Sequence, residues 1–346
     1  MSESKTTYFA AANSYNGFLG YFDRVFRSED FDRIFVLKGG PGTGKSSLMR
    51  ALSKILSDEG CEIEEILCSS DPKSLDGVIA KKGEKRIAIL DGTSPHERDA
   101  VIPGAIDEII NLGDNWDDGW LIGKKREIIS LSNEKKKAYK TAYDYLHLAG
   151  EADNMINGVK MAFYDKSRAK IEAERLLQPF IEKEDGKIST RLISSFGRFG
   201  DYKIQPSKSL FDKQIKVQGN GRYFLKSCAD YLINNQVNIT LFPTAKDPEC
   251  FDAILLESTR ILIIQSEEGE INGNDFLNLS SLDKERCRLA EELKKELLIE
   301  AARWFKIAAE LHSSLEDIYS AAMDFSKNDR IISDIYAKID RIFKNT

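Results

Sequence analysis

The sequence has few of the residues on which disulfide frameworks and metal centres depend. It holds five cysteines, which are scattered and form no CxxC pair, and only three histidines. A disulfide framework, a zinc site and a histidine-rich metal centre are therefore not expected. Scattered thiols of this kind indicate reduced and mostly buried side chains, as in proteins of a reducing compartment.

Signals for membranes and export are also missing. No stretch reaches the roughly 18 uninterrupted apolar residues of a membrane helix, and MSESKTTYF (1–9) lacks the charged and then apolar pattern of a signal peptide. We therefore expect a cytoplasmic protein without a membrane partner. The net charge is −6, and an acidic chain does not attract nucleic acid through its overall field, although a local basic patch stays open.

One short segment carries a phosphate-binding pattern. The residues GGPGTGKSS (39–47) match GxxxxGK[ST], and they lie between the strand-like run Ile34–Leu37 and the helix-like run Leu48–Leu56. Glycines let main-chain N–H groups approach phosphate oxygens, and the N-terminus of a following helix attracts the same oxygens. The expected nucleotide-binding residues are Gly39, Gly40, Pro41, Gly42, Thr43, Gly44, Lys45, Ser46 and Ser47.

Two side chains of this segment have distinct expected roles. Lys45 would reach the β- and γ-phosphates, and the Ser46 hydroxyl would be a ligand of Mg²⁺. The alternative is a chance match to the pattern, but the strand before it and the helix after it are the context that a real site requires.

A second part of such a site is an aspartate at the end of a buried strand. Residues Ile87–Leu90 predict a buried parallel strand, and Asp91 follows at the edge where ligands of α/β sheets collect. We expect Asp91 to hold Mg²⁺ together with Ser46; the alternative is an aspartate that only caps the strand. Many ATP-hydrolysing motors have a glutamate after this aspartate, whereas this chain has Gly92. Any catalytic base must then come from elsewhere, and GTP is not expected because no [NT]KxD motif occurs.

Two more side chains near the same edge are candidates for chemistry. Asp71 lies either near the γ-phosphate or at a helix N-cap, with Pro72 at the first helical position. His96 is either a proton acceptor or γ-phosphate sensor, or a loop histidine bonded to main chain. The expected catalytic set is Lys45, Asp91, Asp71 and His96, and the expected metal ligands are Ser46 and Asp91.

The first half of the chain recurs in the second half in altered form. DPKSLDGVI (71–79) and DPECFDAIL (247–255) share a pattern, and an apolar strand follows each of them. QIKVQGNGRYFLKSCADYL (214–232) corresponds to the phosphate-binding segment, but Arg222 and Tyr223 stand roughly where the lysine and serine are expected. The second half is therefore expected to fold without binding a nucleotide. Arg222 either belongs to that half or serves the first site across an interface.

Each half ends in a stretch whose apolar residues recur at spacings of three and four, which is typical of one face of a helix. We therefore expect an α/β P-loop NTPase fold with a parallel sheet, tandemly duplicated. The expected domains are residues 1–185, with a helical arm at about 120–183, and residues 186–346, a degenerate half with an arm at about 283–346. Such arms favour a protein partner or a homodimer.

The sequence resembles a little-characterised bacterial family of ATP-binding proteins built from two tandem P-loop halves. The resemblance is carried by FAAANSYNGFLGYFD (9–23), FVLKGGPGTGKSSLM (35–49), CSSDPKSLDGVI (68–79) and DGTSPHERDAVIPGAIDEIINLGDNWD (91–117). It covers the first half closely and the second loosely, because the second phosphate loop common in such proteins is absent here. The resemblance implies ATP binding with Mg²⁺ and either hydrolysis or kinase-like transfer, and it names no substrate.

Three functions remain open at this point. The first is an ATPase in which hydrolysis drives a change between the halves or with a partner. The second is a kinase that passes the γ-phosphate to a small acceptor, and the third is a nucleotide sensor without catalysis. The glycine after Asp91 favours the second and third functions, whereas the long arms favour the first and third.

Overall fold

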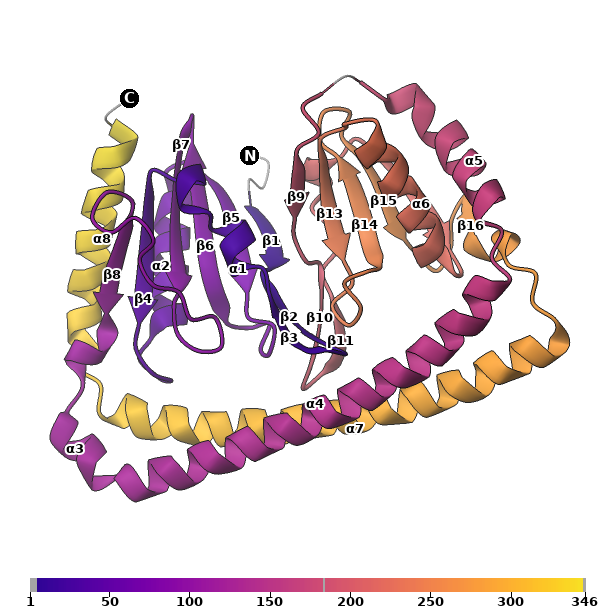
Figure 1. The fold of residues 1–346 in the computed structure, drawn as a ribbon. Helices are drawn as coiled ribbons and strands as arrows, with labels where there is room; N and C mark the ends of the chain where they lie inside the picture. The colour runs from indigo at the N-terminus through magenta and orange to yellow at the C-terminus, as the bar shows by residue number, and fades with distance from the viewer. Residues whose placement is uncertain (1–4, 183, 345–346) are drawn as a thin grey trace.

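The chain forms two α/β units that lie side by side above a pair of long helices (Figure 1). The structure is a computed structural model that describes residues 5–182 and 184–344. Within these residues, no helix is both long enough and apolar enough to cross a bilayer.

The first unit is a six-stranded sheet. In spatial order its strands are β1 (Lys5–Phe9), β5 (Glu62–Leu67), β6 (Leu75–Lys82), β7 (Lys85–Asp91), β4 (Arg33–Lys38) and β8 (Asp107–Asn111). Helix α2 (Lys45–Asp58) follows β4 and buries Leu48, Met49, Leu52 and Leu56. The expected strands before the phosphate-binding segment and before Asp91, and the expected helix after the segment, are confirmed.

The sheet is mixed, so the expectation of a parallel sheet is wrong for part of it. β7, β4 and β8 are parallel, as are β1 and β5, but β6 runs antiparallel to both of its neighbours. Only Gly83 and Glu84 separate β6 from β7, and Gly83 has a positive φ of 60°. A two-residue turn can only join antiparallel strands, because a parallel connection needs a long crossover.

The second unit repeats this arrangement strand for strand. In spatial order it contains β9 (Ile188–Thr190), β13 (Ile239–Pro243), β14 (Phe251–Leu256), β15 (Ile261–Gln265), β12 (Lys213–Gln218) and β16 (Ile271–Asn272). Helix α6 (Gly221–Asn234) follows β12 as α2 follows β4. The chain thus contains two similar sheet units, and each has two antiparallel strand pairs within it.

Two hairpins meet where the units face each other. They are β2 (Ala11–Ser14) with β3 (Gly17–Gly20), and β10 (Ser194–Gly197) with β11 (Gly200–Lys203). An antiparallel bridge between Phe9 and Leu192 joins the units beside the hairpins. The short helices α1 (Phe22–Val25) and α3 (Asp118–Gly123) lie in the first half of the chain.

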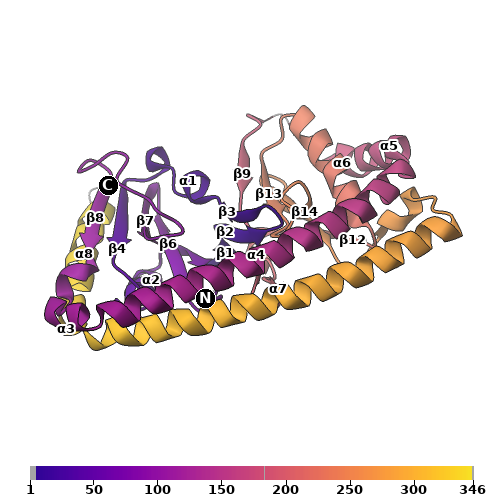
Figure 2. The same ribbon diagram turned by 60° about the horizontal axis from the view of Figure 1, so that its bottom comes forward.

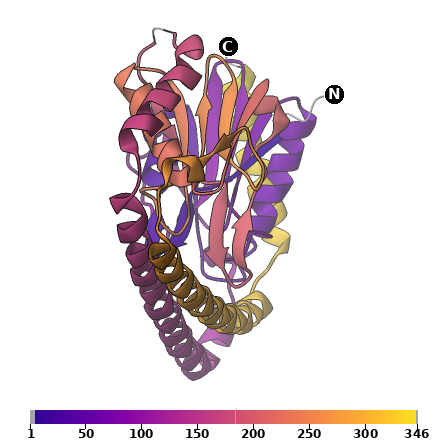
Figure 3. The same cartoon turned by 90° about the vertical axis from the view of Figure 1, so that its right-hand side faces the viewer.

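The two longest helices pack against each other over much of their length. α4 (Lys125–Ala162) runs from the first unit toward the second, and α7 (Ser281–Ala321) returns beside it (Figure 2). Viewed from the side in Figure 3, the helical pair extends to one side of both sheets. The expected arms therefore exist, and they are each other's partners within one chain.

Each half of the chain places its final helix on the other unit. α5 (Lys166–Leu177) packs on α6 and buries Ala169, Ala173 and Leu177 in the core of the second unit. α8 (Ser326–Lys344) packs on α2 and buries Ile335, Ile339 and Phe343 in the core of the first unit. The limits expected at residues 1–185 and 186–346 stay a prediction, and they take in residues 1–4, 183 and 345–346, which lie outside the described residues.

Candidate functional site

The segment between β4 and α2 forms a glycine-rich loop with several unpaired main-chain donors. Gly39, Gly42 and Gly44 have positive φ angles of 144°, 71° and 84°, a region that residues with a Cβ rarely adopt. Within the described residues, the main-chain N–H groups of Gly40, Gly42 and Gly44 donate no hydrogen bond to the chain. Consecutive free N–H groups at a helix N-terminus form a concave site that suits phosphate oxygens.

Thr43 and Ser47 flank this loop in different ways. Thr43 is buried, and its Oγ1 donates a hydrogen bond of 3.0 Å to the Gly40 carbonyl, which holds the loop closed. Ser47 is exposed on the first turn of α2, and Pro41 is partly exposed at the tip of the loop. The loop shape thus depends on glycine torsions and on one internal hydroxyl contact.

Lys45 and Asp91 bring opposite charges together beside the loop. The Lys45 Nζ donates to the carbonyl oxygens of Gly39 (2.6 Å) and Gly40 (2.9 Å), and it lies 3.6 Å from Asp91 Oδ2. Asp91 comes this close because β7 is the parallel neighbour of β4, with Leu37 opposite Asp91. The ammonium is therefore already folded back over the loop where phosphate charge would be held.

The Asp91 carboxylate is also anchored locally. Its Oδ1 accepts hydrogen bonds from the Thr93 main-chain N–H (2.8 Å) and from Thr93 Oγ1 (2.6 Å), as in a strand-capping aspartate. Burial raises the pKa of Asp91, while Lys45 lowers it and Asp76 raises it further. One oxygen thus caps the turn and the other faces Lys45, and the expected role of Asp91 as a metal ligand stays a prediction.

The expected metal ligands fit a magnesium ion that arrives with a nucleotide. The Ser46 Oγ accepts a hydrogen bond of 2.9 Å from the Leu75 main-chain N–H and keeps a second lone pair. Among the described residues, no group of three or more His, Cys, Asp or Glu side chains is placed to hold a metal ion. Mg²⁺ at phosphate sites needs no such group, because phosphate oxygens and waters complete its shell around one or two protein ligands.

His96 is paired with a carboxylate that the sequence analysis did not select. Its Nε2 lies 3.1 Å from Asp76 Oδ2, both side chains are buried, and the Phe22 ring stacks on the imidazole at 4.6 Å. Burial lowers the pKa of His96, but the Asp76 carboxylate outweighs it, so the pKa is raised overall. The His96 side chain is thus paired with a carboxylate rather than with main chain.

A signal for Asp76 existed in the sequence. Asp76 and Asp252 are the second aspartates of the pattern shared by residues 71–79 and 247–255. Asp252 is likewise buried, and Ser194 Oγ donates a hydrogen bond to it. Buried aspartates are rare unless they have a partner, so a carboxylate that recurs at the start of a buried antiparallel strand indicates a specific contact at that position.

Asp71 lies in a turn rather than at a helix N-terminus. Its Oδ1 accepts a hydrogen bond of 3.2 Å from the Lys73 main-chain N–H, and strand β6 begins soon after, at Leu75. The helix-capping alternative is therefore wrong. The other carboxylate oxygen of Asp71 lies 2.9 Å from Nη2 of Arg198, a residue of the second unit.

The end of α7 and the start of α8 cover the loop of residues 39–47. Ser320 Oγ donates to the Gly42 carbonyl (3.1 Å), and Asn328 Nδ2 donates to the Thr43 carbonyl (3.3 Å). A Cβ built on Gly42 would lie 2.5 Å from the Glu316 main-chain oxygen, so only glycine fits beneath the helix. Nothing local in the sequence predicts these contacts, because they join residues more than 250 positions apart.

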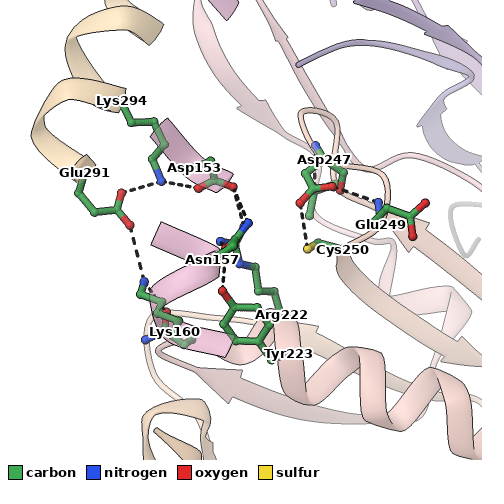
Figure 4. Close-up of polar contacts among 12 residues, drawn as sticks. Asp153, Asn157, Lys160, Arg222, Tyr223, Asp247, Glu249, Cys250, Glu291 and Lys294 are labelled. Carbon is green, nitrogen blue, oxygen red and sulfur yellow. Dashed lines mark hydrogen bonds and ion pairs between the residues drawn. The ribbon is translucent and has the colours of Figure 1, made fainter. Parts of the chain in front are cut away.

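The corresponding loop of the second unit is filled by side chains from α4. Figure 4 shows Arg222 directed at Asp153, with Nη1 3.0 Å from Asp153 Oδ2, and Lys294 Nζ lies 2.9 Å from the other carboxylate oxygen. Asn157 accepts hydrogen bonds from Arg222 and from the Tyr223 hydroxyl. Burial alone would raise the pKa of Asp153, but Arg222 and Lys294 together lower it, so the carboxylate is firmly charged.

No known protein family, curated protein or solved structure matches this chain.

Proposed function

We propose that the protein binds ATP with Mg²⁺ at residues 39–47 and hydrolyses it in the first unit. One observation supports this most: free N–H groups of positive-φ glycines lie at a helix N-terminus, beside a Lys45–Asp91 pair at the end of the parallel strands. This combination supplies the donors, the cation and the metal-facing carboxylate that a triphosphate requires. The matching strand orders of the two units support an origin by duplication, in which only the first unit kept a nucleotide site.

The reaction assigns a role to each group. The loop N–H groups and Lys45 would hold the β- and γ-phosphate oxygens, while Ser46 and Asp91 would hold Mg²⁺, which would supply neutralising charge. A water oxygen bonds to the γ-phosphorus, the bond to the bridging oxygen of ADP breaks, and one proton is released. Because catalysis of this reaction is mainly positioning and charge stabilisation, a strong protein base is not required.

The covered loop supports coupling between the nucleotide and the helices. Ser320 and Asn328 contact carbonyls of the loop, so a change of loop shape on binding or hydrolysis reaches α7 and α8 directly. A sensor without catalysis uses the same contacts. It is favoured by Gly92, which stands where many ATP-hydrolysing motors have a glutamate.

The decisive experiment compares two lysines of one helix. Lys45→Ala removes the proposed phosphate-binding cation, whereas Lys54→Ala removes an exposed lysine that pairs with Asp58 on the same helix. Calorimetric titration with a non-hydrolysable ATP analogue and Mg²⁺ should lose at least tenfold in affinity for Lys45→Ala and none for Lys54→Ala. Phosphate release measured in parallel separates ATPase from sensor, whereas ADP formation that rises with a small acceptor without matching phosphate release indicates a kinase. Unchanged binding in Lys45→Ala would refute the site.

A further inference from the structure

A hairpin of the second unit places an arginine against the edge of the first sheet at which β5 and β7 end. Arg198 and Phe199 form the turn between β10 and β11. The hairpin is fixed to the first unit, because Ser195 Oγ donates to the Ser69 carbonyl (2.7 Å) and Asn13 Nδ2 donates to the Phe196 carbonyl (2.7 Å). The turn therefore rests on residues 69–71, which follow strand β5 at the same sheet edge.

The Arg198 guanidinium is only partly used in this position. Nη2 lies 2.9 Å from Asp71 Oδ2, and the side chain is 26% exposed. Within the described residues, its Nε is buried and has no hydrogen-bond partner. A guanidinium has five N–H donors in a planar fork, so Arg198 keeps donors for a second anion.

The turn that contains Asp71 also reaches the first turn of α2. Strand β6 begins at Leu75, soon after Asp71, and the Leu75 main-chain N–H donates a hydrogen bond of 2.9 Å to Ser46 Oγ, next to Lys45. Asp71 and its partner Arg198 therefore lie at the same end of the sheet as Lys45 and the loop of residues 39–47.

The second unit provides an internal comparison. The hairpin of β2 and β3 rests on the second unit in the same manner, since the Tyr15 main-chain N–H donates to the Lys246 carbonyl (3.0 Å). Ser14 pairs with Gly17 as Gly197 pairs with Gly200, so Tyr15 stands at the position of Arg198. The arginine is present only opposite the unit that has a lysine in its phosphate loop, and a tyrosine replaces it opposite the unit whose loop is filled.

We propose that Arg198 contacts the γ-phosphate of ATP bound in the first unit and stabilises its charge during hydrolysis. This inference rests on the proposed function. The covalent change is the one given above: water adds to the γ-phosphorus, ADP leaves and one proton is released, while Arg198 forms only hydrogen bonds. Asp71 is a positioning residue that holds the guanidinium at the sheet edge. The second unit thus contributes a catalytic cation in place of a nucleotide site of its own.

Arginine substitutions separate this role from nucleotide binding. Arg198→Ala and Arg198→Lys are compared with Lys203→Ala, which alters an exposed lysine on the same hairpin. For Arg198→Ala we expect kcat to fall at least 100-fold, because an arginine at this position is typically worth about 10³–10⁵ in rate. Affinity for the non-hydrolysable ATP analogue should change less than tenfold. Arg198→Lys should recover only part of the rate, and Lys203→Ala should remain within twofold of the wild type.

The outcomes distinguish the inference from the proposed function. Wild-type kcat in Arg198→Ala overturns the role of Arg198 and leaves the ATPase intact, whereas a wild-type protein that binds no ATP analogue overturns both. If the wild type binds ATP without turnover, trapping of ADP with aluminium fluoride and Mg²⁺ decides: trapping lost in the arginine variants supports the role, and equal or absent trapping overturns it. If Arg198→Ala does not fold, as judged by circular dichroism, Arg198→Lys is judged by the same criteria.

Discussion

Lys45 and Asp91 form an ion pair, and each of the two side chains also has a second set of contacts. The ammonium lies over the glycine carbonyls and faces one oxygen of Asp91, while the other oxygen is occupied by Thr93. Under the proposed function, Lys45 would turn to phosphate oxygens and Asp91 would exchange the lysine for a hydrated metal. In the structure, the pair keeps two partly buried charges satisfied by each other.

Asp91→Asn tests the metal half of this arrangement. The amide preserves the bonds accepted from Thr93 but removes the negative charge, so the loop should remain folded. Mg²⁺ should tighten binding of the ATP analogue to the wild type, and on the order of tenfold or more of that tightening should disappear in the variant. Titrations with Mg²⁺ and with EDTA measure the difference, and Asp58→Asn on exposed α2 surface is the control. Equal Mg²⁺ dependence in both proteins would argue against Asp91 as a metal ligand.

The His96–Asp76 pair should make the free energy of unfolding depend on pH, and the direction of that dependence follows from the pKa shift of His96. Its folded-state pKa is raised, chiefly by Asp76, so the pair contributes stability below the unfolded-state pKa of about 6.5 and loses it as pH rises through the folded-state value. The unfolding free energy of the wild type should therefore exceed that of His96→Gln most in mildly acidic solution, with the gap narrowing in alkali. Urea titrations across this range measure it, with exposed His147→Gln as control. A gap that widens with pH would contradict the assignment.

Local patterns predict the parts of the site that are local. The glycine loop, Lys45, Ser46 and Asp91 follow from a short motif and from apolar strands, because those residues act within one loop or one strand end. Asp76 and Arg198 are different, since their partners come from other loops and from the other unit. Sequence patterns indicate that such residues carry charge, but only the folded chain brings the charges together.

The end of α7 acts as a close cover on the phosphate loop. Gly42 and Gly60 both have positive φ, but a Cβ on Gly42 would collide with Glu316 and Ser320, whereas a Cβ on Gly60 meets nothing within 4 Å. The two positions therefore have similar backbone strain and differ in their contact with the helix. This pair of glycines makes it possible to test the cover separately from the strain.

Gly42→Ala should weaken nucleotide binding and stability more than Gly60→Ala. Strain alone costs about 1–2 kcal/mol at either position, and displacement of α7 adds about 1–3 kcal/mol for Gly42→Ala only. Thermal unfolding gives the stability difference, and titration with the ATP analogue gives the change in affinity. Equal losses in the two variants would mean that α7 does not press on the loop.

The direction of strand β6 is the property of the sheet that the sequence pattern did not predict. Apolar runs predict β4 and β7 well, but the direction of β6 depends on a two-residue turn that the apolar pattern does not reveal. The helical arms were predicted from their stripes, yet the stripes do not say which surface covers them. Here α4 and α7 cover each other, and α5 and α8 cover the opposite units.

The two units together should bind one nucleotide per chain. The second loop has no lysine directed at a phosphate, and Asp153 neutralises Arg222 where an incoming anion would bind. Titration of the intact protein with the non-hydrolysable ATP analogue and Mg²⁺ should give one site per chain, and Lys45→Ala should abolish it. Two sites, or one site that survives Lys45→Ala, would show that the second unit is not degenerate.

The exchange of final helices has a consequence for synthesis on the ribosome. Domains usually fold as they emerge, with the N-terminal one first, while the chain grows at about 5–20 residues per second. The first unit cannot follow that order, because Ile335, Ile339 and Phe343 of its core are made after the whole second unit. Its phosphate loop likewise waits for Ser320 and Asn328. A chain that stops early therefore lacks the contacts that cover residues 39–47, so only molecules translated through α8 acquire the complete candidate site.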